Sequence, residues 1–177
     1  IIGVGGDGTI NAIINHSLCL SNKTYGIIPF GSGNDLIYTL KIPKNIDKSI
    51  QVIKNNKFSY IDIGKIKTEK FNKFFLNAAG IGFDAMVANK TNNIKIIDGQ
   101  LKYYLSLIYC LFKYKYHLTN INIDENYRKT LNPFLITIGN GKRTGGTFLL
   151  TPNAIINDAL FQICLVDQVS IPFIIKS

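Results

Sequence analysis

A short apolar segment runs directly into a glycine-rich loop at the start of the chain, and this pairing limits the possible folds most. Residues 1–4 (IIGV) are apolar throughout, as a buried parallel strand is, and Gly5–Thr9 (GGDGT) follows at once. From residue 9 to residue 20 the apolar side chains recur at helical spacing. The order of strand, glycine loop and helix predicts the first part of a parallel sheet covered by helices.

This alternation continues to about residue 55 and then changes character. Residues 25–30 predict a second strand, and residues 34–40 and 45–55 predict helices. We therefore expect an α/β domain with a parallel sheet over residues 1–60. A β-rich, mostly antiparallel α+β domain is expected over 61–177. Its predicted elements are a hairpin (60–67 and 71–78), helices (84–92 and 101–118), strands on either side of the turn at 124–126 (118–124 and 131–138), and strands at 148–150 and 160–166.

Composition excludes several classes of protein. Of the 177 residues, 46% are hydrophobic, which is enough to bury a core and excludes a disordered chain. The three cysteines form no C-x-x-C pair, which argues against a disulfide scaffold or a cysteine zinc site and favours a reducing compartment. The net charge of +9 permits anionic partners. No predicted helix carries a basic stripe with base-reading residues, so we expect no nucleic-acid partner.

The glycine loop is suited to phosphate. Glycines allow a ligand to approach the backbone, and the helix that follows points its free N–H groups at the loop. A plain tight turn is the alternative interpretation, and three glycines with an aspartate in the loop disfavour it. Residues 3–8 also satisfy G-x-G-x-x-G, but no acidic residue occurs between Asp7 and Asp35 to hold a ribose, which disfavours a dinucleotide fold. Asp7 would repel a polyphosphate unless Mg²⁺ or a substrate hydroxyl lay beside it, and both belong to phosphoryl transfer.

Several motifs in a fixed order resemble the diacylglycerol kinase catalytic domain. The similarity extends over essentially the whole chain and is closest to the soluble bacterial lipid kinases related to diacylglycerol and sphingosine kinases. GGDGT alone is shared with NAD kinases and phosphofructokinases, whereas its combination with the later motifs is specific to lipid kinases. These motifs are Gly5–Thr9, Gly26–Asp35 (GIIPFGSGND), Ile61–Gly64 (IDIG), Asn77–Asp84 (NAAGIGFD), Gly139–Gly141, Gly145–Gly146, Thr151–Ala154 and Asn157–Asp158.

The resemblance implies an ATP-dependent kinase that transfers the γ-phosphoryl group to a hydroxyl of diacylglycerol or a related lipid. Residues 1–60 would then be the C-terminal part of the nucleotide-binding domain. The alternatives are an NAD kinase-like or sphingoid-base kinase, and a non-catalytic module that binds nucleotide or lipid. The implied cofactors are ATP and Mg²⁺, and the implied role is in phospholipid metabolism.

The resemblance also implies roles for particular residues. Asp7, Asp35 and Asp62 would line an interdomain cleft as catalytic residues with a magnesium–water network. A structural Mg²⁺ would be held by the Asp158 carboxylate and the carbonyls of Ile155 and Leu160. The ATP-binding residues would be Gly5, Gly6, Asp7, Gly8, Thr9, Ile10, Asn11 and Ser32.

Some residues have a second interpretation from sequence alone. Asp35 follows a glycine loop, where a helix N-cap is nearly as well supported as a catalytic role. Asp84 is better explained as a helix cap than as a ligand. Lys142 and Arg143 are either an anion contact or part of a solvated loop. The family usually has Asp-Gly where this chain has Asp158 and Ala159, and a glycine needed for positive φ would leave Ala159 strained.

The chain is interpreted as a fragment. It begins inside a strand, and the general base of the family is expected beyond Ser177, so we expect the full-length protein to be a kinase and this stretch alone to be inactive. The segment 101–118 is too short and too interrupted by lysines to span a bilayer. It is either a core helix or a helix at a membrane interface. We expect a cytoplasmic protein associated peripherally with an anionic membrane surface. The sequence does not decide whether the protein forms a homodimer.

Overall fold

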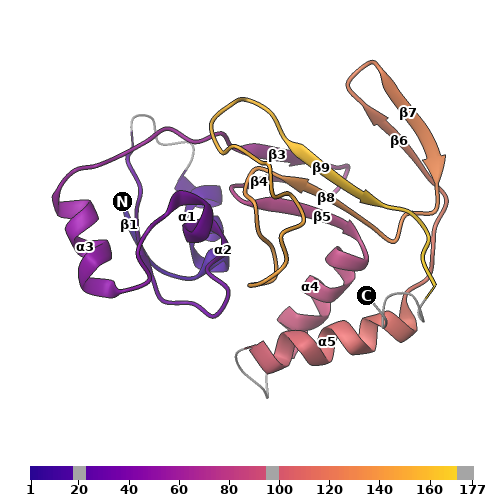
Figure 1. The fold of residues 1–177 in the computed structure, drawn as a ribbon, viewed down its shortest axis with the longest axis horizontal. Coiled ribbons are helices and arrows are strands. Elements are labelled where there is room, and N and C mark those ends of the chain that lie inside the picture. The colour runs from indigo at the N-terminus through magenta and orange to yellow at the C-terminus, as the bar shows by residue number, and fades with distance from the viewer. Residues whose placement is uncertain (18–22, 95–99, 171–177) are drawn as a thin grey trace. The chain divides into compact units, whose positions relative to one another are not determined.

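The computed structural model describes residues 1–17, 23–94 and 100–170 (Figure 1). The chain forms two compact units, and the first is discontinuous. Unit 1 comprises Ile1–Ala79 and Gly139–Gln162, and unit 2 comprises Gly80–Ile138 and Ile163–Ser177. These spatial units do not test the expected division at residues 60 and 61, which stays a prediction. The elements are β1 (Ile2–Gly5), α1 (Asp7–Ser17), β2 (Gly26–Pro29), α2 (Asp35–Leu40), α3 (Ile46–Lys54), β3 (Gly64–Lys67), β4 (Asn72–Phe75), β5 (Ala78–Gly82), α4 (Phe83–Asn93), α5 (Gln100–Lys113), β6 (Thr119–Ile123), β7 (Tyr127–Leu131), β8 (Leu135–Gly139) and β9 (Gln162–Val166).

Unit 1 opens with the predicted strand–helix–strand arrangement. β1 and β2 pair in parallel, with Ile2 opposite Gly26 and Gly5 opposite Pro29, so the ends of both strands reach the same edge. The apolar spacing of α1 turns Ile10 and Ile14 into a buried core with residues of β2 and α2. The glycine loops that follow β1 and β2 therefore lie next to each other.

A side-chain amide joins α1 to the antiparallel pair β3–β4. Asn15 Nδ2 donates to the carbonyl of Phe74 at 2.9 Å, and the Phe74 N–H donates to Asn15 Oδ1 at 2.8 Å. The amide thus satisfies both backbone groups of a strand residue, as a neighbouring strand would. It holds α1 against β4, which pairs with β3 from Gly64 opposite Phe75 to Lys67 opposite Asn72.

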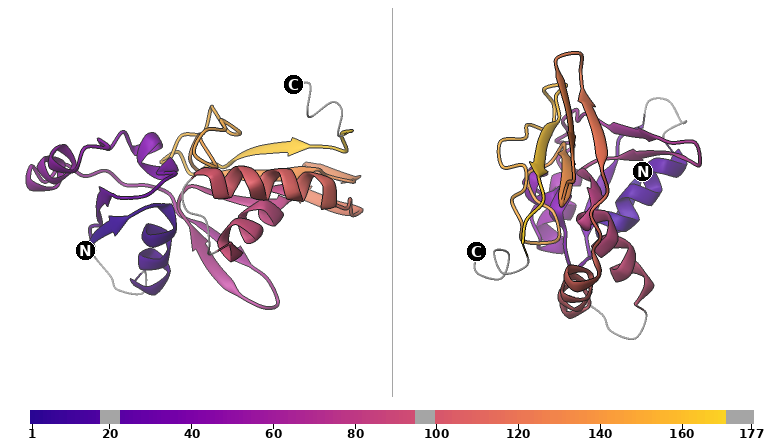
Figure 2. Two further views of the ribbon diagram at one scale, coloured as in Figure 1. Left: turned by 90° about the horizontal axis from the view of Figure 1, so that it is seen from below. Right: turned by 90° about the vertical axis from the view of Figure 1, so that its right-hand side faces the viewer.

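Unit 2 contains α4, α5 and the antiparallel ribbon β6–β7, while β5, β8 and β9 form a three-stranded sheet in the order β5-β8-β9 (Figure 2). Its core joins α4 to α5 through Phe83, Val87, Cys110 and Leu111, with Phe134 stacked on Phe83 at 4.4 Å between ring centroids. The expected fold class, a parallel sheet with helices followed by a β-rich antiparallel part, is confirmed.

The helix predicted over residues 101–118 ends earlier, at Lys113. Two tyrosines beyond this end bond to backbone carbonyls through their hydroxyls: Tyr114 donates to the Pro133 carbonyl at 2.9 Å and Tyr116 to the Val169 carbonyl at 2.6 Å. Among the described residues, no helix combines the length and the apolar character needed to cross a bilayer.

Three predictions for the β-rich part were wrong, and one prediction for the α/β part falls outside the described residues. The turn at residues 124–126 leads into β7, a strand that the sequence did not predict, rather than into residues 131–138. Residues 148–150 form no strand, and only an isolated bridge joins Thr144 to Phe148. β5 was also missed. The predicted end of the first helix, residues 18–20, lies outside the described residues.

Candidate active site in unit 1

The two glycine loops are in direct backbone contact. The Phe30 N–H donates to the Gly5 carbonyl at 2.9 Å, which continues the pairing of β1 and β2 beyond the strands. Just beyond, Gly31 lies so close to Gly6 that a Cβ on Gly31 would overlap the Gly6 Cα. Position 31 must therefore be glycine for the loops to meet, whereas a Cβ on Gly6 would make a tight contact of 3.0 Å with the Gly31 Cα. The meeting of the loops brings the first turns of α1 and α2 together.

Asp7, the first residue of α1, caps the other helix. Its Oδ2 accepts from the Asp35 N–H at 3.0 Å and its Oδ1 from the Leu36 N–H at 2.9 Å. Asn34 precedes α2 with a left-handed φ of 53° and makes no side-chain cap of its own. The Asp7 carboxylate takes over that role, because a negative charge is favourable at a helix N-terminus.

Asp35 is nearly buried, with 7% of its surface exposed, and it has an ionic partner. Arg143 Nε donates to Asp35 Oδ1 at 2.9 Å, and the Gly146 N–H donates to both carboxylate oxygens at 3.0 Å. The guanidinium of Arg143 also lies over the Tyr38 ring, 4.5 Å from its centroid. Asp35 lies inside the first turn of α2 and is not its N-cap, and Arg143 is part of an ion pair rather than of a solvated loop.

The environment of Asp35 disfavours its charge despite this pairing. Burial raises the pKa of the Asp35 carboxyl, and the nearby Asp7 charge raises it further. The Gly146 N–H and the Arg143 guanidinium act in the opposite direction and do not offset the burial. The cluster of Asp7, Asp35 and Arg143 thus holds two carboxylates against one cation, a setting in which a second cation is favourable.

Asp62 sits in a separate part of unit 1, against the loop at residues 155–160. Its N–H donates to the Ile156 carbonyl at 2.8 Å, and its Oδ2 accepts from the Ala159 N–H at 2.7 Å. Ala159 has a φ of 61°, which is the left-handed conformation. This is the strain expected at a position where the family usually has glycine after aspartate. Asn140, which is fully buried, donates its amide to the carbonyls of Asp62 and Leu76, each at 2.8 Å.

The predicted metal-binding residues lie on this same loop. Asp158 Oδ1 accepts from the Leu160 N–H at 3.0 Å. In the described part of the chain, no group of three or more His, Cys, Asp or Glu side chains is placed to hold a metal ion. A divalent cation here would depend on the Asp158 carboxylate together with the carbonyls of Ile155 and Leu160, and these three residues are exposed. Such oxygen donors suit Mg²⁺.

The predicted ATP-binding residues divide into two kinds. Gly8 and Thr9 are exposed in the first turn of α1, and a Cβ added at Gly8 would meet nothing within 4 Å. Ile10 is in the core, and its N–H donates to the Gly6 carbonyl at 3.1 Å. The N–H groups of the residues before it have no intrahelical acceptor, so the loop presents free donors to solvent.

Three polar residues of the site were not identified as such from the sequence. From the sequence, Arg143 is either an anion contact or part of a solvated loop, and no role is predicted for Asn34 or Asn140. The Oδ1 atoms of Asn34 and Asn140 are buried without a hydrogen-bond partner. A buried amide oxygen of this kind is a site for water or a ligand donor. The only signal in the sequence for such a role is the position of Asn34 beside a glycine loop.

The predicted residues are thus brought together in two groups. Asp7 and Asp35 share one hydrogen-bonded network, and Asp62 shares another with the loop that carries Asp158. Within the ranges that the structure describes, no hydrogen bond links Asp62 to Asp7 or Asp35. Asp84 lies in unit 2, where Thr137 Oγ1 donates to its Oδ2 at 3.4 Å, and the N-cap of α4 is Gly82 rather than Asp84.

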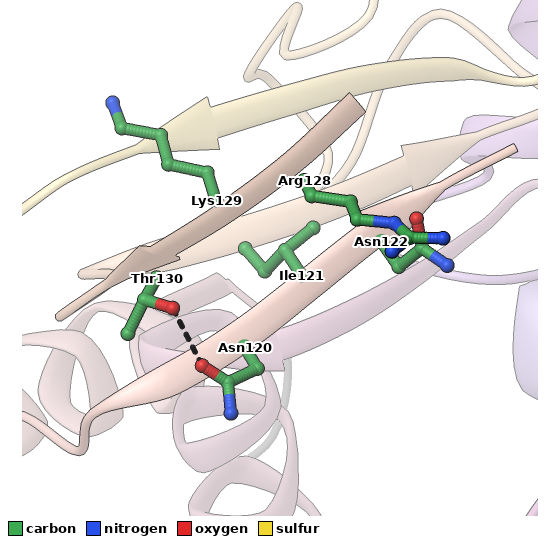
Figure 3. A pocket seen from close by; sticks show the side chains of 6 residues that line it. All are labelled: Asn120, Ile121, Asn122, Arg128, Lys129 and Thr130. Atoms are coloured by element: carbon green, nitrogen blue, oxygen red, sulfur yellow. Dashed lines mark hydrogen bonds between the residues drawn. The ribbon is translucent and has the colours of Figure 1, made fainter. Parts of the chain in front are cut away.

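An open hollow of about 570 Å³ lies elsewhere, along the ribbon β6–β7 of unit 2. Figure 3 shows the six residues that line it and the hydrogen bond from Thr130 Oγ1 to Asn120 Oδ1, at 2.6 Å. It contains none of the predicted site residues. Its lining is Asn120, Ile121, Asn122, Arg128, Lys129 and Thr130.

Two protein families match successive parts of the chain. Residues 1–66 match the diacylglycerol kinase catalytic domain, and residues 77–177 match the YegS C-terminal NAD kinase beta sandwich-like domain. The second match alone covers more than half of the chain. The chain belongs to the diacylglycerol kinase family of the YegS type. This confirms the resemblance that the motifs indicated.

Individual relatives agree with this membership. Proteins named "Probable lipid kinase YegS-like" from Yersinia pestis and Yersinia pseudotuberculosis are 31% identical over 169 residues, which are 93% of this chain and 56% of each relative. A crystal structure of a diacylglycerol kinase from Bacillus anthracis has a TM-score of 0.71 at 27% identity and covers 99% of this chain and 57% of that one. The chain therefore spans a little over half the length of the relatives it matches.

Proposed function

We propose that this chain is part of an ATP-dependent lipid kinase that transfers the γ-phosphoryl group of ATP to a hydroxyl of diacylglycerol or a related lipid. The observation that carries the proposal is the contact of two glycine loops beneath the exposed first turn of α1, with Asp7 joining that turn to α2. Family membership supports the reaction class, because the relatives are named lipid kinases.

The glycine loop would hold the ATP phosphates. Gly5, Gly6, Gly8 and Thr9 would approach them through the backbone, and Asn11 and Ser32 through polar side chains. Ile10 would contribute only its backbone, because its side chain is in the core. The open space over Gly8 supports this assignment, since a phosphate needs close access to the backbone.

The carboxylates would set the charge around the transferred group. Asp7, Asp35 and Asp62 would hold positions from which they orient water or a cation, and Arg143 would keep the buried Asp35 in place. The excess of carboxylate over cation at Asp7 and Asp35 fits a divalent ion there. The Asp158 carboxylate and the carbonyls of Ile155 and Leu160, all three exposed residues, fit a structural one. Mg²⁺, when bound, neutralises phosphate charge. The general base would come from the part of the protein beyond Ser177.

One alternative differs from the proposal in its acceptor, and the other differs in having no turnover. An NAD kinase-like or sphingoid-base enzyme would share the nucleotide loop and differ in the acceptor, while a binding module would hold ATP without turnover. The decisive assay uses the full-length gene product with radiolabelled ATP and, in separate reactions, diacylglycerol, sphingosine and NAD. Label in phosphatidic acid supports the proposal, and label only in another product replaces it. Binding of ATP without transfer to any acceptor supports the non-catalytic module.

The site assignment has its own test. Asp62→Asn keeps an oxygen that can accept from the Ala159 N–H but removes the charge, so we expect lipid phosphorylation to fall at least 100-fold with little change in stability. Asp47→Asn, in the first turn of α3, is the matched control and should retain activity. Activity of Asp62→Asn within twofold of wild type would remove Asp62 from the catalytic set.

A further inference from the structure

The two carboxylate groups of unit 1 are connected through the end of strand β4. In the part of the chain that the structure describes, Asp62 makes no hydrogen bond to Asp7 or Asp35, so other contacts set the separation of the two groups. Two asparagine side chains supply such contacts. Asn15 binds the backbone of β4, and Asn140 binds the backbone directly after it.

Asn15 attaches the helix that begins at the glycine loop to β4. Its Nδ2 donates to the Asn11 carbonyl in the same helix at 2.8 Å and to the Phe74 carbonyl at 2.9 Å, and its Oδ1 accepts from the Phe74 N–H at 2.8 Å. Both N–H groups and the oxygen of the amide are thus used, which leaves the side chain one orientation. Asp7 is the first residue of the same helix. A shift of β4 would therefore move α1 and Asp7 with it.

Asn140 attaches the Asp62 backbone to the residues that follow β4. It is fully buried, and its Nδ2 donates to the carbonyls of Asp62 and Leu76 at 2.8 Å each. Its own N–H donates to the Asn77 carbonyl at 2.8 Å. Only a donor group satisfies two carbonyl oxygens, and the amide makes both bonds although its Oδ1 stays buried without a partner. An aspartate or an apolar side chain at this position could not make them.

The same short segment also reaches Asp35. Asn77 Nδ2 donates to the Arg143 carbonyl at 2.8 Å, and Arg143 Nε donates to the Asp35 carboxylate at 2.9 Å. All of these residues belong to unit 1. Phe74 and Asn77 are three residues apart, which is at most about 11 Å of chain. Residues 74–77 therefore form a short backbone connection between both carboxylate groups.

We propose that Asn15 and Asn140 are positioning residues of the kinase reaction, which fix Asp62 relative to the glycine-loop turn through residues 74–77. Their side chains act on backbone groups and need no contact with the substrate. Phosphoryl transfer depends on such alignment, since a misplacement of about 1 Å can lower the rate about 100-fold. The effect on catalysis rests on the proposed function, whereas the connection is a property of the fold.

Amide hydrogen exchange of the full-length protein tests the connection without any substrate. Asn15→Ala should speed exchange of the Asp62 N–H at least about tenfold, although the hydrogen bonds of Asn15 do not reach that residue. Asn140→Ser, which keeps one donor, should speed exchange of the Phe74 N–H in the same way. Ser49→Ala is the matched control, because it removes a fully buried hydroxyl that donates to a carbonyl within α3, and it should change neither amide. Rates are compared with those of the α3 amides in the same protein, which report any general loss of stability.

Kinetics of the same variants test the effect on the reaction. At saturating ATP, Asn15→Ala and Asn140→Ser should each lower kcat at least about tenfold and leave the KM for ATP within about threefold of wild type. ATP still binds the glycine loop in these variants, but the groups around it are misaligned. The double variant should lose little more than the larger single loss, because both substitutions act through one segment. Ser49→Ala should keep the wild-type kcat.

Three outcomes overturn the proposal. They are unchanged exchange at the far end of the connection in both variants, losses of kcat that multiply in the double variant, and a wild-type kcat in both single variants. Urea unfolding identifies a variant that fails to fold, and Asn15→Asp, which keeps the acceptor for the Phe74 N–H, then replaces Asn15→Ala. A wild-type protein without kinase activity would overturn the proposed function instead, and the exchange measurement would still decide whether the connection exists.

Discussion

Arg143 Nε donates to Asp35 Oδ1 over 2.9 Å, although the two residues lie 108 positions apart in the chain. The pair joins the second segment of unit 1 to the first turn of α2. Both side chains are largely buried, at 13% and 10% exposed, so each depends on the other for compensation of its charge.

Removing one partner of this pair should lower the free energy of unfolding strongly, and removing both partners should lower it much less. Arg143→Gln leaves Asp35 buried without its cation and should lower the free energy of unfolding by about 3 kcal/mol. Asp35→Asn/Arg143→Gln should lose much less, because no buried charge remains. Urea unfolding of wild type, both single variants and the double variant gives the coupling energy. Additive losses would show that the pair is not coupled.

Substitution of the left-handed Ala159 by glycine should change the stability in the opposite direction from the same substitution at an alanine inside a helix. Ala159→Gly relieves a φ of 61° and should stabilise the protein by about 1 kcal/mol while keeping the bond to Asp62. Ala88→Gly, on the exposed side of α4, should destabilise it by about 1 kcal/mol. Thermal unfolding measures both. If the two substitutions shift the midpoint in the same direction, the strain at Ala159 is absent.

The glycines of the two loops should separate packing from ligand binding. Gly31→Ala places a methyl group on the Gly6 backbone and should destabilise the fold by several kcal/mol, on the order of an overpacked core. Gly8→Ala meets open space within a helix and should be neutral or stabilising by up to about 1 kcal/mol. If phosphate approaches this turn, Gly8→Ala should still weaken ATP binding at least tenfold, as calorimetry would detect. Unchanged ATP affinity would place the nucleotide elsewhere.

Asp84 predicts a pH effect in unit 2. Burial raises the pKa of its carboxyl above 3.8, so the folded state holds the proton more tightly than the unfolded state does. Stability from this group therefore falls as the pH rises from 3.8 through the raised pKa. Asp84→Asn should be more stable than wild type by on the order of 1 kcal/mol at neutral pH and not at about pH 4. Glu125→Gln is the exposed control, and an equal effect of both variants would attribute the change to net charge.

Local patterns made the start of unit 1 predictable from sequence. The apolar runs of β1 and β2, the glycine loops and the spacing of α1 each follow from short-range rules. The assignment of Asp7 to a phosphate-binding turn rests on the same rules and stays a prediction. The pairing of Asp7 with the N-terminus of α2 was not predictable, because it depends on how two loops meet. The same holds for Arg143, whose partner is 108 positions away.

The errors in unit 2 have identifiable physical causes. β7 (Tyr127–Leu131) is exposed at four of its five positions, so it lacks the apolar alternation that predicts a half-buried strand. The end of α5 was placed too late because Tyr114 and Tyr116 continue the apolar pattern. Their hydroxyls nevertheless bond to backbone carbonyls outside the helix, and that tertiary preference cannot be read from spacing.

The discontinuity of unit 1 has a consequence for the order of events on the ribosome. Asp35 leaves the ribosome 108 residues before Arg143 does, which at typical elongation rates corresponds to roughly 5–20 s. During that interval the first turn of α2 has its Asp7 cap but no cation for the Asp35 carboxylate. The folded first segment of unit 1 is therefore expected to be less stable during this interval. Synthesis of residues 139–162 is expected to supply the missing contacts and complete unit 1.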